Sequence, residues 1–143
     1  MLVGILQPSY LPWLGFFEQM AKVDIFVLYD DVQYDRRSWR NRNRIKNSQG
    51  VQWLSVPVMT KGKRAQLINQ ARIDSATKWE LKHLTSLELN YKKAIYFNHF
   101  YCQIEPLLNK KWGYLLDLNL NLLNLLNEYL GIKTQVILSS SLL

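Results

Sequence analysis

Near its start the chain reads Leu2-Val3-Gly4-Ile5-Leu6-Gln7-Pro8-Ser9-Tyr10-Leu11-Pro12-Trp13, an apolar run that leads directly into a polar and aromatic turn. The apolar run at residues 2–6 predicts a short buried strand. Pro12 suits the first turn of a helix, where a missing backbone N–H costs nothing. Apolar residues then recur at helical spacing up to Ala21, so we expect a helix over residues 12–22.

A second apolar run, Ile25-Phe26-Val27-Leu28-Tyr29, follows a short turn and predicts a second strand. Two strands joined so closely through a helix form a right-handed parallel βαβ unit. The carboxyl ends of the two strands then lie side by side, at the edge where ligands bind in open α/β sheets. We therefore expect a functional site among the residues that follow Leu6 and Tyr29.

The rest of the chain predicts two further strands and three helices. Residues 51–58 read as a strand that ends near Pro57, and residues 135–138 as a final strand. One helix begins at Thr77, and two more span residues 95–111 and 117–130, with Gly131 placed for a left-handed cap. The predicted fold class is three-layer α/β with a mainly parallel sheet and a helical second half, forming a single domain over residues 1–143.

The composition is that of a globular domain, with 48% hydrophobic and 20% charged residues. No uncharged apolar stretch reaches 18 residues, so we expect no membrane insertion. The start of the chain lacks the features of a signal peptide, and the single Cys102 forms no internal disulfide, which favours a cytoplasmic protein. The absence of Walker A, GxGxxG, GxSxG and CxxC motifs argues against ordinary ATPases, Rossmann dehydrogenases, serine hydrolases and thioredoxins.

The net charge of +7 is concentrated in one segment. Residues 35–46 hold one acidic residue, Asp35, and six basic ones: Arg36, Arg37, Arg40, Arg42, Arg44 and Lys46. A local positive charge of this kind indicates an anionic partner. The partner predicted is a phosphorylated or nucleotide-linked small molecule, with nucleic acid as the alternative.

The basic segment also carries the groups that such a ligand needs. Arginine binds phosphate or carboxylate with paired hydrogen bonds, asparagine adds neutral donors, and tryptophan stacks on a base or a sugar face. The alternative is a solvated loop or a nucleic-acid patch without chemistry. The predicted substrate-binding residues from this region are Gln33, Trp39, Arg40, Asn41, Arg42, Asn43 and Lys46.

Two polar turns follow the first two predicted strands. In the first, Gln7 offers an amide, Tyr10 a hydroxyl on a flat ring, and Trp13 an aromatic wall, although the segment also suits a plain βα turn. In the second, Asp30 and Asp31 are candidates for a base or an orienting carboxylate. The alternative is that Asp31 forms an ion pair with Arg40 or Arg42.

Trp79 and His83 lie four residues apart on one face of a predicted helix. An aromatic ring beside an imidazole suits substrate contact and acid–base catalysis, which makes His83 a catalytic candidate and Trp79 a binding candidate. A buried, hydrogen-bonded histidine is equally compatible with the pattern. His99 and Cys102 are read as packing residues, because two ligands do not make a zinc site, and no metal site is predicted. The sequence names no cofactor.

Four motifs occur in a fixed order along the chain, and Trp79, His83 and Ser139-Ser140 follow them. The motifs are Gln7-Pro8-Ser9-Tyr10-Leu11-Pro12-Trp13-Leu14-Gly15-Phe16-Phe17, Asp30-Asp31-Val32-Gln33-Tyr34, Trp39-Arg40-Asn41-Arg42-Asn43-Arg44-Ile45-Lys46 and Trp53-Leu54-Ser55-Val56-Pro57-Val58. With them the chain resembles the WbqC-like protein family over essentially its whole length. The resemblance implies a place in bacterial gene clusters for O-antigen and other surface polysaccharides. Members of the family usually continue for many tens of residues further, so we expect this chain to be truncated at its C-terminus.

The order of elements is also similar to that of the nucleotidylyltransferase fold. In that fold a His-x-Gly-His motif stabilises the transferring phosphate, and a late strand leads to a Ser-Ser-containing motif. Here Trp13 and Phe16 stand where the histidines would be, so a nucleotide-binding α/β layer is implied and ordinary nucleotidyl transfer is not.

The function predicted from these observations is an enzyme that modifies a sugar or an activated precursor for surface polysaccharide, for example by transfer from a nucleotide-sugar, acyl or aminoacyl donor. The alternatives are a non-catalytic basic module that binds nucleic acid and a scaffold protein of a polysaccharide assembly complex. Neither the substrate nor the oligomeric state follows from the sequence.

Overall fold

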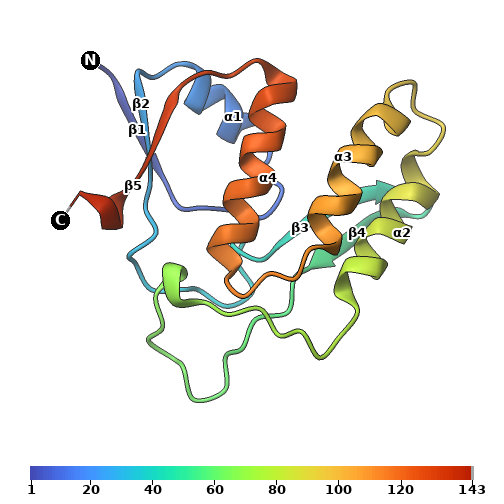
Figure 1. The fold of residues 1–143 in the computed structure, drawn as a ribbon, viewed down its shortest axis with the longest axis horizontal. Helices are drawn as coiled ribbons and strands as arrows, with labels where there is room; N and C mark the ends of the chain where they lie inside the picture. The colour runs from blue at the N-terminus through green and yellow to red at the C-terminus, as the bar shows by residue number, and fades with distance from the viewer. Residues whose placement is uncertain (143) are drawn as a thin grey trace.

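A parallel three-stranded sheet lies at one end of the molecule in the computed structural model, which describes residues 1–142 (Figure 1). Its strands are β1 (Val3–Leu6), β2 (Ile25–Leu28) and β5 (Gln135–Leu138), in the order β1-β2-β5. Helix α1 (Leu14–Ala21) joins β1 to β2, so the predicted parallel βαβ unit is confirmed. β2 also pairs in parallel with β5, in a register that places Leu28 beside Leu138.

The second sheet is a two-stranded antiparallel hairpin of β3 (Arg42–Asn47) and β4 (Gly50–Ser55), joined by Ser48 and Gln49. The prediction identified β4 but missed β3, because its alternating basic and asparagine residues were read as a charged binding segment. In β3 only Ile45 is apolar, yet its partner strand buries Leu54, and this pairing holds the polar strand in place. The antiparallel hairpin is separate from the parallel sheet.

Three helices form most of the second half: α2 (Trp79–Tyr91), α3 (Phe97–Asn109) and α4 (Leu115–Leu130). The predicted helical second half is therefore confirmed. Gly131 ends α4 with a φ of +67°, in the left-handed conformation that its lack of a Cβ allows. Short 3-10 turns, η1 (Ile68–Gln70) and η2 (Ser139–Ser141), complete the description.

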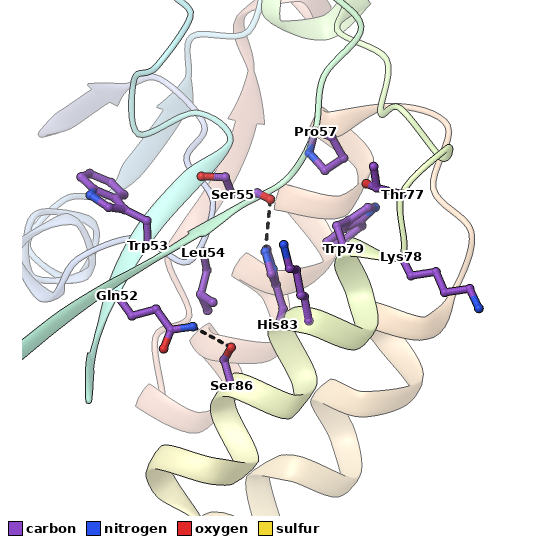
Figure 2. Close-up of a pocket in the computed structure, with 11 residues that line it drawn as sticks. Gln52, Trp53, Leu54, Ser55, Pro57, Thr77, Lys78, Trp79, His83 and Ser86 are labelled. Atoms are coloured by element: carbon purple, nitrogen blue, oxygen red, sulfur yellow. Dashed lines mark hydrogen bonds between the residues drawn. The ribbon is translucent and has the colours of Figure 1, made fainter. Parts of the chain in front are cut away.

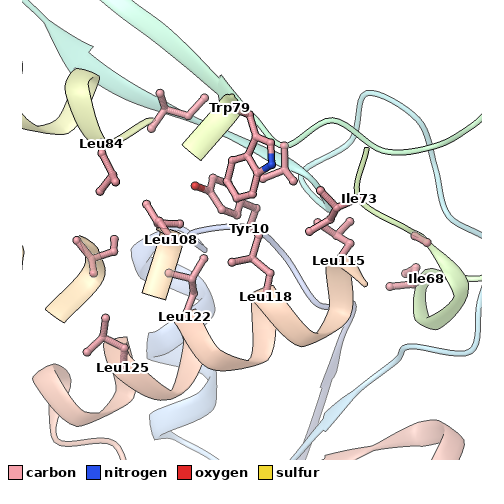
Figure 3. Close-up of a cluster of buried hydrophobic side chains, with 14 of the residues drawn as sticks. Tyr10, Ile68, Ile73, Trp79, Leu84, Leu108, Leu115, Leu118, Leu122 and Leu125 are labelled. Carbon is pink, nitrogen blue, oxygen red and sulfur yellow. The ribbon is translucent and has the colours of Figure 1, made fainter. Parts of the chain in front are cut away.

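Helix α4 lies between the parallel sheet and the remaining elements (Figure 1). One side of α4 packs Leu123 against Phe16 of α1 and Phe26 of β2. Its other side packs Leu118 and Leu122 into a larger core together with the hairpin, α2 and α3 (Figure 3). The molecule thus has layers in the order parallel sheet, α1 and α4, then the hairpin with α2 and α3.

The outer face of the parallel sheet is less covered than the face that contacts α1 and α4. Ile5 is 60% exposed, and Val3 is also exposed, whereas Phe26 and Leu28 on the helix-facing side are fully buried. The mixed α/β class with a parallel opening is confirmed. No helix within residues 1–142 has the length and apolar character needed to cross a membrane.

Candidate functional site

The outward face of the hairpin collects the basic residues of the sequence motif. Arg42, Arg44 and Lys46 alternate along β3 and therefore share one face of the strand. In the register of the hairpin, Arg44 lies opposite Trp53 and Lys46 opposite Val51 on β4. The intervening residues, such as Ile45, face the larger core. A strand that looks like a charged loop in the sequence thus presents three cations to one side.

Two tryptophans on this face form an aromatic platform for the arginines. The ring centroids of Trp39 and Trp53 are 5.5 Å apart at an interplanar angle of 35°. The guanidinium carbon of Arg42 lies 4.3 Å from the centroid of Trp53, and that of Arg44 lies 5.4 Å from Trp39 and 5.5 Å from Trp53. These cation–π contacts fix the positions of the guanidinium groups while leaving their charge uncompensated.

No arginine within residues 1–142 has a carboxylate partner within 4.0 Å, since the ion pairs there are Met1 with Asp24 and Lys22 with Glu18. The predicted alternative for Asp31, an ion pair with Arg40 or Arg42, is therefore wrong. Arg42 donates instead to the carbonyl of Arg37. The positive charge of the hairpin face is available to a ligand.

Two cavities meet at Trp13 and Trp39. The inner cavity has a volume of about 280 Å³ and lies at the carboxyl end of β1, where it is lined by Ile5, Leu6, Gln7, Ser9, Trp13, Phe16, Tyr29, Trp39 and Arg40. The second cavity, which we call the trough, has a volume of about 910 Å³ and is lined by Trp13, Trp39, Asn43, Arg44, Ile45, Lys46, Gly50 and Val51. The shared tryptophans make the sheet edge and the hairpin face one continuous surface.

Arg40 brings a partly buried cation to the inner cavity. Its backbone carbonyl accepts a hydrogen bond from Asn119 Nδ2 at 2.9 Å, which anchors the residue to α4. Its Nε is buried and has no hydrogen-bond partner among the described residues. Burial lowers the pKa of Arg40, and the charge of Asp35 opposes that shift. A buried, unpaired N–H costs free energy, so Arg40 is held here at the expense of stability.

Trp13 lies across the first turn of α1 and is 64% exposed. The Trp13 ring can occupy this position because residue 15 is glycine. A Cβ added at Gly15 would lie 1.9 Å from the ring. Gly15 therefore determines where this wall shared by the trough and the inner cavity stands.

We expect Gly15→Ala to displace the Trp13 ring and to weaken ligand binding as much as Trp13→Ala does. Stability should not fall, because alanine favours a helix over glycine by about 1 kcal/mol. Calorimetry with a trial ligand and urea unfolding measure the two effects. Unchanged affinity in Gly15→Ala would show that the Trp13 ring is not part of the site.

Asp30 is held at the carboxyl ends of β2 and β5 by donors from distant segments. Its Oδ1 accepts the Ser140 backbone N–H at 3.0 Å, and its Oδ2 accepts the Ser140 hydroxyl at 2.7 Å and Asn69 Nδ2 at 3.3 Å. Ser139 Oγ lies 3.0 Å from Asp30 Oδ1 and also contacts Asp31. Its single proton serves one carboxylate at a time.

These contacts make Asp30 a structural carboxylate. Burial raises its pKa, but the bonds from Ser140, Ser139 and Asn69 outweigh burial, so the pKa lies below the ordinary value. Asp30 is fully buried, whereas Asp31 is half-buried beside it. The predicted edge does gather polar groups, but its central carboxylate is already saturated with donors.

His83 lies on the floor of a cleft between β4 and α2, and only 3% of it is exposed (Figure 2). The cleft has a volume of about 620 Å³; Lys78 and Lys82 also line it, and Gln52 is bonded to Ser86 across it. His83 Nε2 lies 3.2 Å from the Ser55 carbonyl oxygen. A carbonyl oxygen can accept a hydrogen bond but cannot donate one. Nε2 therefore carries the proton.

The other ring nitrogen of His83 is occupied as well. With Nε2 protonated, the neutral ring accepts at Nδ1 the hydroxyl proton of Tyr10, 2.7 Å away. Tyr10 is fully buried and Trp79, in edge contact with the imidazole, is 4% exposed (Figure 3). Burial raises the pKa of Tyr10 and lowers that of His83 to about 4. Tyr10, Trp79 and His83 thus form a hydrogen-bonded part of the larger core, separate from the trough.

His83 predicts a pH dependence of stability. The pKa of His83 is about 4 in the folded protein and 6.5 ordinarily. Between pH 4 and pH 6.5 the histidine is therefore protonated in the unfolded chain and neutral in the folded protein. Stability should fall by about 3 kcal/mol as pH drops from 6.5 to 4. Urea unfolding at several pH values measures this, and His83→Phe should lose that dependence. Equal pH dependence in both proteins would contradict the assignment.

The remaining predicted residues support the backbone around the site. Asn41 Nδ2 donates to the Val56 carbonyl at 2.7 Å, and Asn43 Nδ2 donates to the Leu11 carbonyl. Leu11 has a φ of +45°, so Asn43 holds a strained turn in front of Trp13. Gln33 donates to the Arg64 carbonyl at 2.9 Å, in the segment that leads to η1.

Comparison with known proteins identifies the family. The model of the WbqC-like protein family matches residues 7–143. The chain belongs to this family. An uncharacterized protein of Mycobacterium tuberculosis is 46% identical over 135 residues, which cover 94% of this chain and 58% of that protein. No solved structure matches the chain. This WbqC-like chain therefore spans little more than half the length of its mycobacterial relative.

The structure of this WbqC-like protein brings some predicted residues together and separates others. Gln7, Trp13, Trp39, Arg40, Asn43 and Lys46 line the inner cavity or the trough. Tyr10 and Trp79 belong to the larger core, and Asp30 belongs to the sheet closure. His83 is hydrogen-bonded to Tyr10 and lies on the floor of the cleft between β4 and α2. The prediction of site residues missed Arg44 and Trp53. The signal for Arg44 was the two-residue alternation of cations from Arg42 to Lys46, which is typical of a strand, whereas Trp53 joins that face only through the pairing of β4 with β3.

Proposed function

We propose that this WbqC-like protein binds a phosphorylated or nucleotide-linked sugar in the trough and the inner cavity. The observation that carries the proposal is the pair Arg42 and Arg44, held over Trp53 without a carboxylate partner among the described residues, with Arg44 lining the aromatic-walled trough. Uncompensated arginines beside exposed tryptophans suit a ligand with an anionic part and a flat apolar face.

The two cavities suggest how such a ligand is arranged. A phosphate group fits beside Arg44 and Lys46 in the trough, and the face of a sugar or base fits against Trp13 and Trp39. The inner cavity offers the amide of Gln7, the hydroxyl of Ser9 and the charge of Arg40 to polar groups of the ligand. The volume of the trough falls in the size range common for small-molecule sites, and the inner cavity adds a smaller space beside it.

The family resemblance suggests the process that this binding serves. It is the modification of an activated sugar for O-antigen or another surface polysaccharide, with the chain acting as a transferase or as part of one. In this proposal Asp30 and His83 maintain the structure rather than react, because the hydrogen-bonding capacity of both groups is used internally. Asp31 retains the assignment of orienting carboxylate.

A thermal-shift screen tests the proposed function. A ligand that binds only the folded protein raises its melting temperature with concentration, and at one hundred times its dissociation constant the stabilisation is about 2.7 kcal/mol. We expect a uridine or deoxythymidine diphosphate sugar to give a larger shift than inorganic phosphate or the free sugar. No shift with any phosphorylated sugar, in this chain or in a full-length relative, would reject the proposal.

Single-stranded nucleic acid is a second candidate ligand, favoured by the extent of the basic surface. Trp53 also lines the cleft that contains Lys78 and Lys82, so the cations continue across β4 from the trough. Stacked bases on tryptophans and a basic track are the common means of binding single strands. Titration at increasing salt distinguishes the two: oligonucleotide binding falls steeply through counterion release, whereas binding of one sugar nucleotide falls much less.

A further inference from the structure

A separate cavity between the hairpin and the tips of α2 and α3 is almost entirely apolar. It has a volume of about 540 Å³ and is lined by Ile45 from β3, Leu87 and Tyr91 from α2, Ala94, Ile95 and Tyr96 from the connecting segment, and Phe97, Phe100, Tyr101 and Ile104 from α3. Three tyrosine hydroxyls are the polar side-chain groups of this lining. We call it the apolar cavity.

The apolar cavity is open at one end and closed at the other. The connecting segment forms the open end, where Ile95 is 91% exposed and Tyr96 78% exposed. Ile104 forms the closed end and is 1% exposed. Large apolar side chains exposed at the mouth of an apolar cavity are typical of a surface that binds an apolar partner.

Charged groups around the apolar cavity differ between its two ends. The open end carries Lys92 and Lys93, which are exposed and stand between the lining residues Tyr91 and Ala94. Glu105 follows Ile104 directly in the chain, and burial together with the charges of Glu105 and Glu88 raises the pKa of the lining residue Tyr101. A ligand with an apolar tail and an anionic head therefore fits in one direction, with its head at the lysines.

We propose that the apolar cavity binds the alkyl chain of a single-chain amphiphile with a phosphate head. The chain lies against Phe100 and Ile104, and the phosphate lies at the open end beside Lys92 and Lys93. This site is distinct from the trough, although Ile45 lines both. The protein then holds an alkyl phosphate and a sugar ligand on two sides of β3.

Calorimetry with dodecyl phosphate, kept below the concentration at which it forms micelles, tests this proposal. We expect dodecyl phosphate to bind at least tenfold more tightly than butyl phosphate or inorganic phosphate, and more tightly than dodecyltrimethylammonium. Equal affinity for dodecyl and butyl phosphate would show that no alkyl chain is bound. Tighter binding of dodecyltrimethylammonium would overturn the assignment of the head group.

Three variants locate the site. Ala94→Trp fills the cavity from an exposed position and should reduce the affinity for dodecyl phosphate at least tenfold. Ile95→Glu places an anion at the open end, where folding does not depend on the side chain, and should have a similar effect, whereas Ile95→Leu should bind as the parent protein does. Parental affinity in both Ala94→Trp and Ile95→Glu would overturn the proposal. Sugar-nucleotide binding should stay unchanged in all three, which separates this test from that of the trough.

Discussion

Replacing Asp30 with alanine is expected to lower the free energy of unfolding by about 4 kcal/mol, since bonds to charged groups are worth about 1.5–3 kcal/mol each and add incompletely. The change removes the acceptor for Ser140, Ser139 and Asn69, whose partly buried bonds to the fully buried Asp30 tie distant segments of the chain together. It also removes the side-chain links from η1 and η2 to the end of β2, although the backbone bond from the Asn69 N–H to the carbonyl of residue 30 remains. Urea unfolding measures the loss.

Asp35→Ala is the matched control for Asp30→Ala, because Asp35 is exposed and its removal changes the charge equally. Its effect should stay within about 0.5 kcal/mol. The acid side offers a further check. The pKa of Asp30 is lowered in the folded protein, so its stabilisation is present above the unfolded pKa and disappears as pH falls through the folded one. A loss below 1 kcal/mol in Asp30→Ala would mean that the sheet closes without this carboxylate.

Trp39→Ala is expected to weaken binding of the sugar nucleotide by about 30-fold, because stacking on one aromatic ring contributes about 1–3 kcal/mol. Trp39 lines both cavities, stacks on Trp53 and supports Arg44, so its loss affects every part of the proposed site. The side chain is 42% exposed, and the protein should therefore remain folded. Calorimetry measures the affinity.

Two comparisons separate stacking from charge. Trp39→Phe keeps an aromatic face and should retain most of the affinity that Trp39→Ala loses. Arg44→Ala should weaken binding about tenfold by removing a charge-assisted contact with phosphate. Lys133→Ala, at the opposite end of the parallel sheet from the inner cavity, makes the same change of net charge and should bind as the parent does. Similar losses in Arg44→Ala and Lys133→Ala would indicate general charge attraction rather than a defined site.

Local periodicity predicted most of the fold. The βαβ opening, α3 and α4 were predicted with ends within two residues of the observed ones, and α2 begins two residues after its predicted start. The strand β3 was missed because its stability comes from pairing with β4 and from the packing of Ile45, which no local pattern reveals. Polar strands of this kind depend on their partners.

The site was predictable in composition but not in arrangement. Trp13, Trp39 and Arg40 were predicted to bind ligand, and they line adjoining cavities. Trp79 and His83 were chosen because they share a helical face, but the spacing does not say whether that face meets solvent or the core. Asp30 meets Ser139 across 109 residues, a contact that depends on the order of strands rather than on local sequence.

The pairing of β5 with β2 also determines when the fold can form. During synthesis β1, α1 and β2 are made long before residues 135–138, which form β5. The edge of β2 that pairs with β5 therefore stays unpaired while the hairpin and three helices are made. Contacts between residues so far apart in sequence slow folding, because the entropy of closing a long loop is lost before the contacts form and stabilise the chain. The nascent chain therefore leaves one edge of the apolar strand β2 unpaired for most of its synthesis, and an unpaired apolar edge favours aggregation.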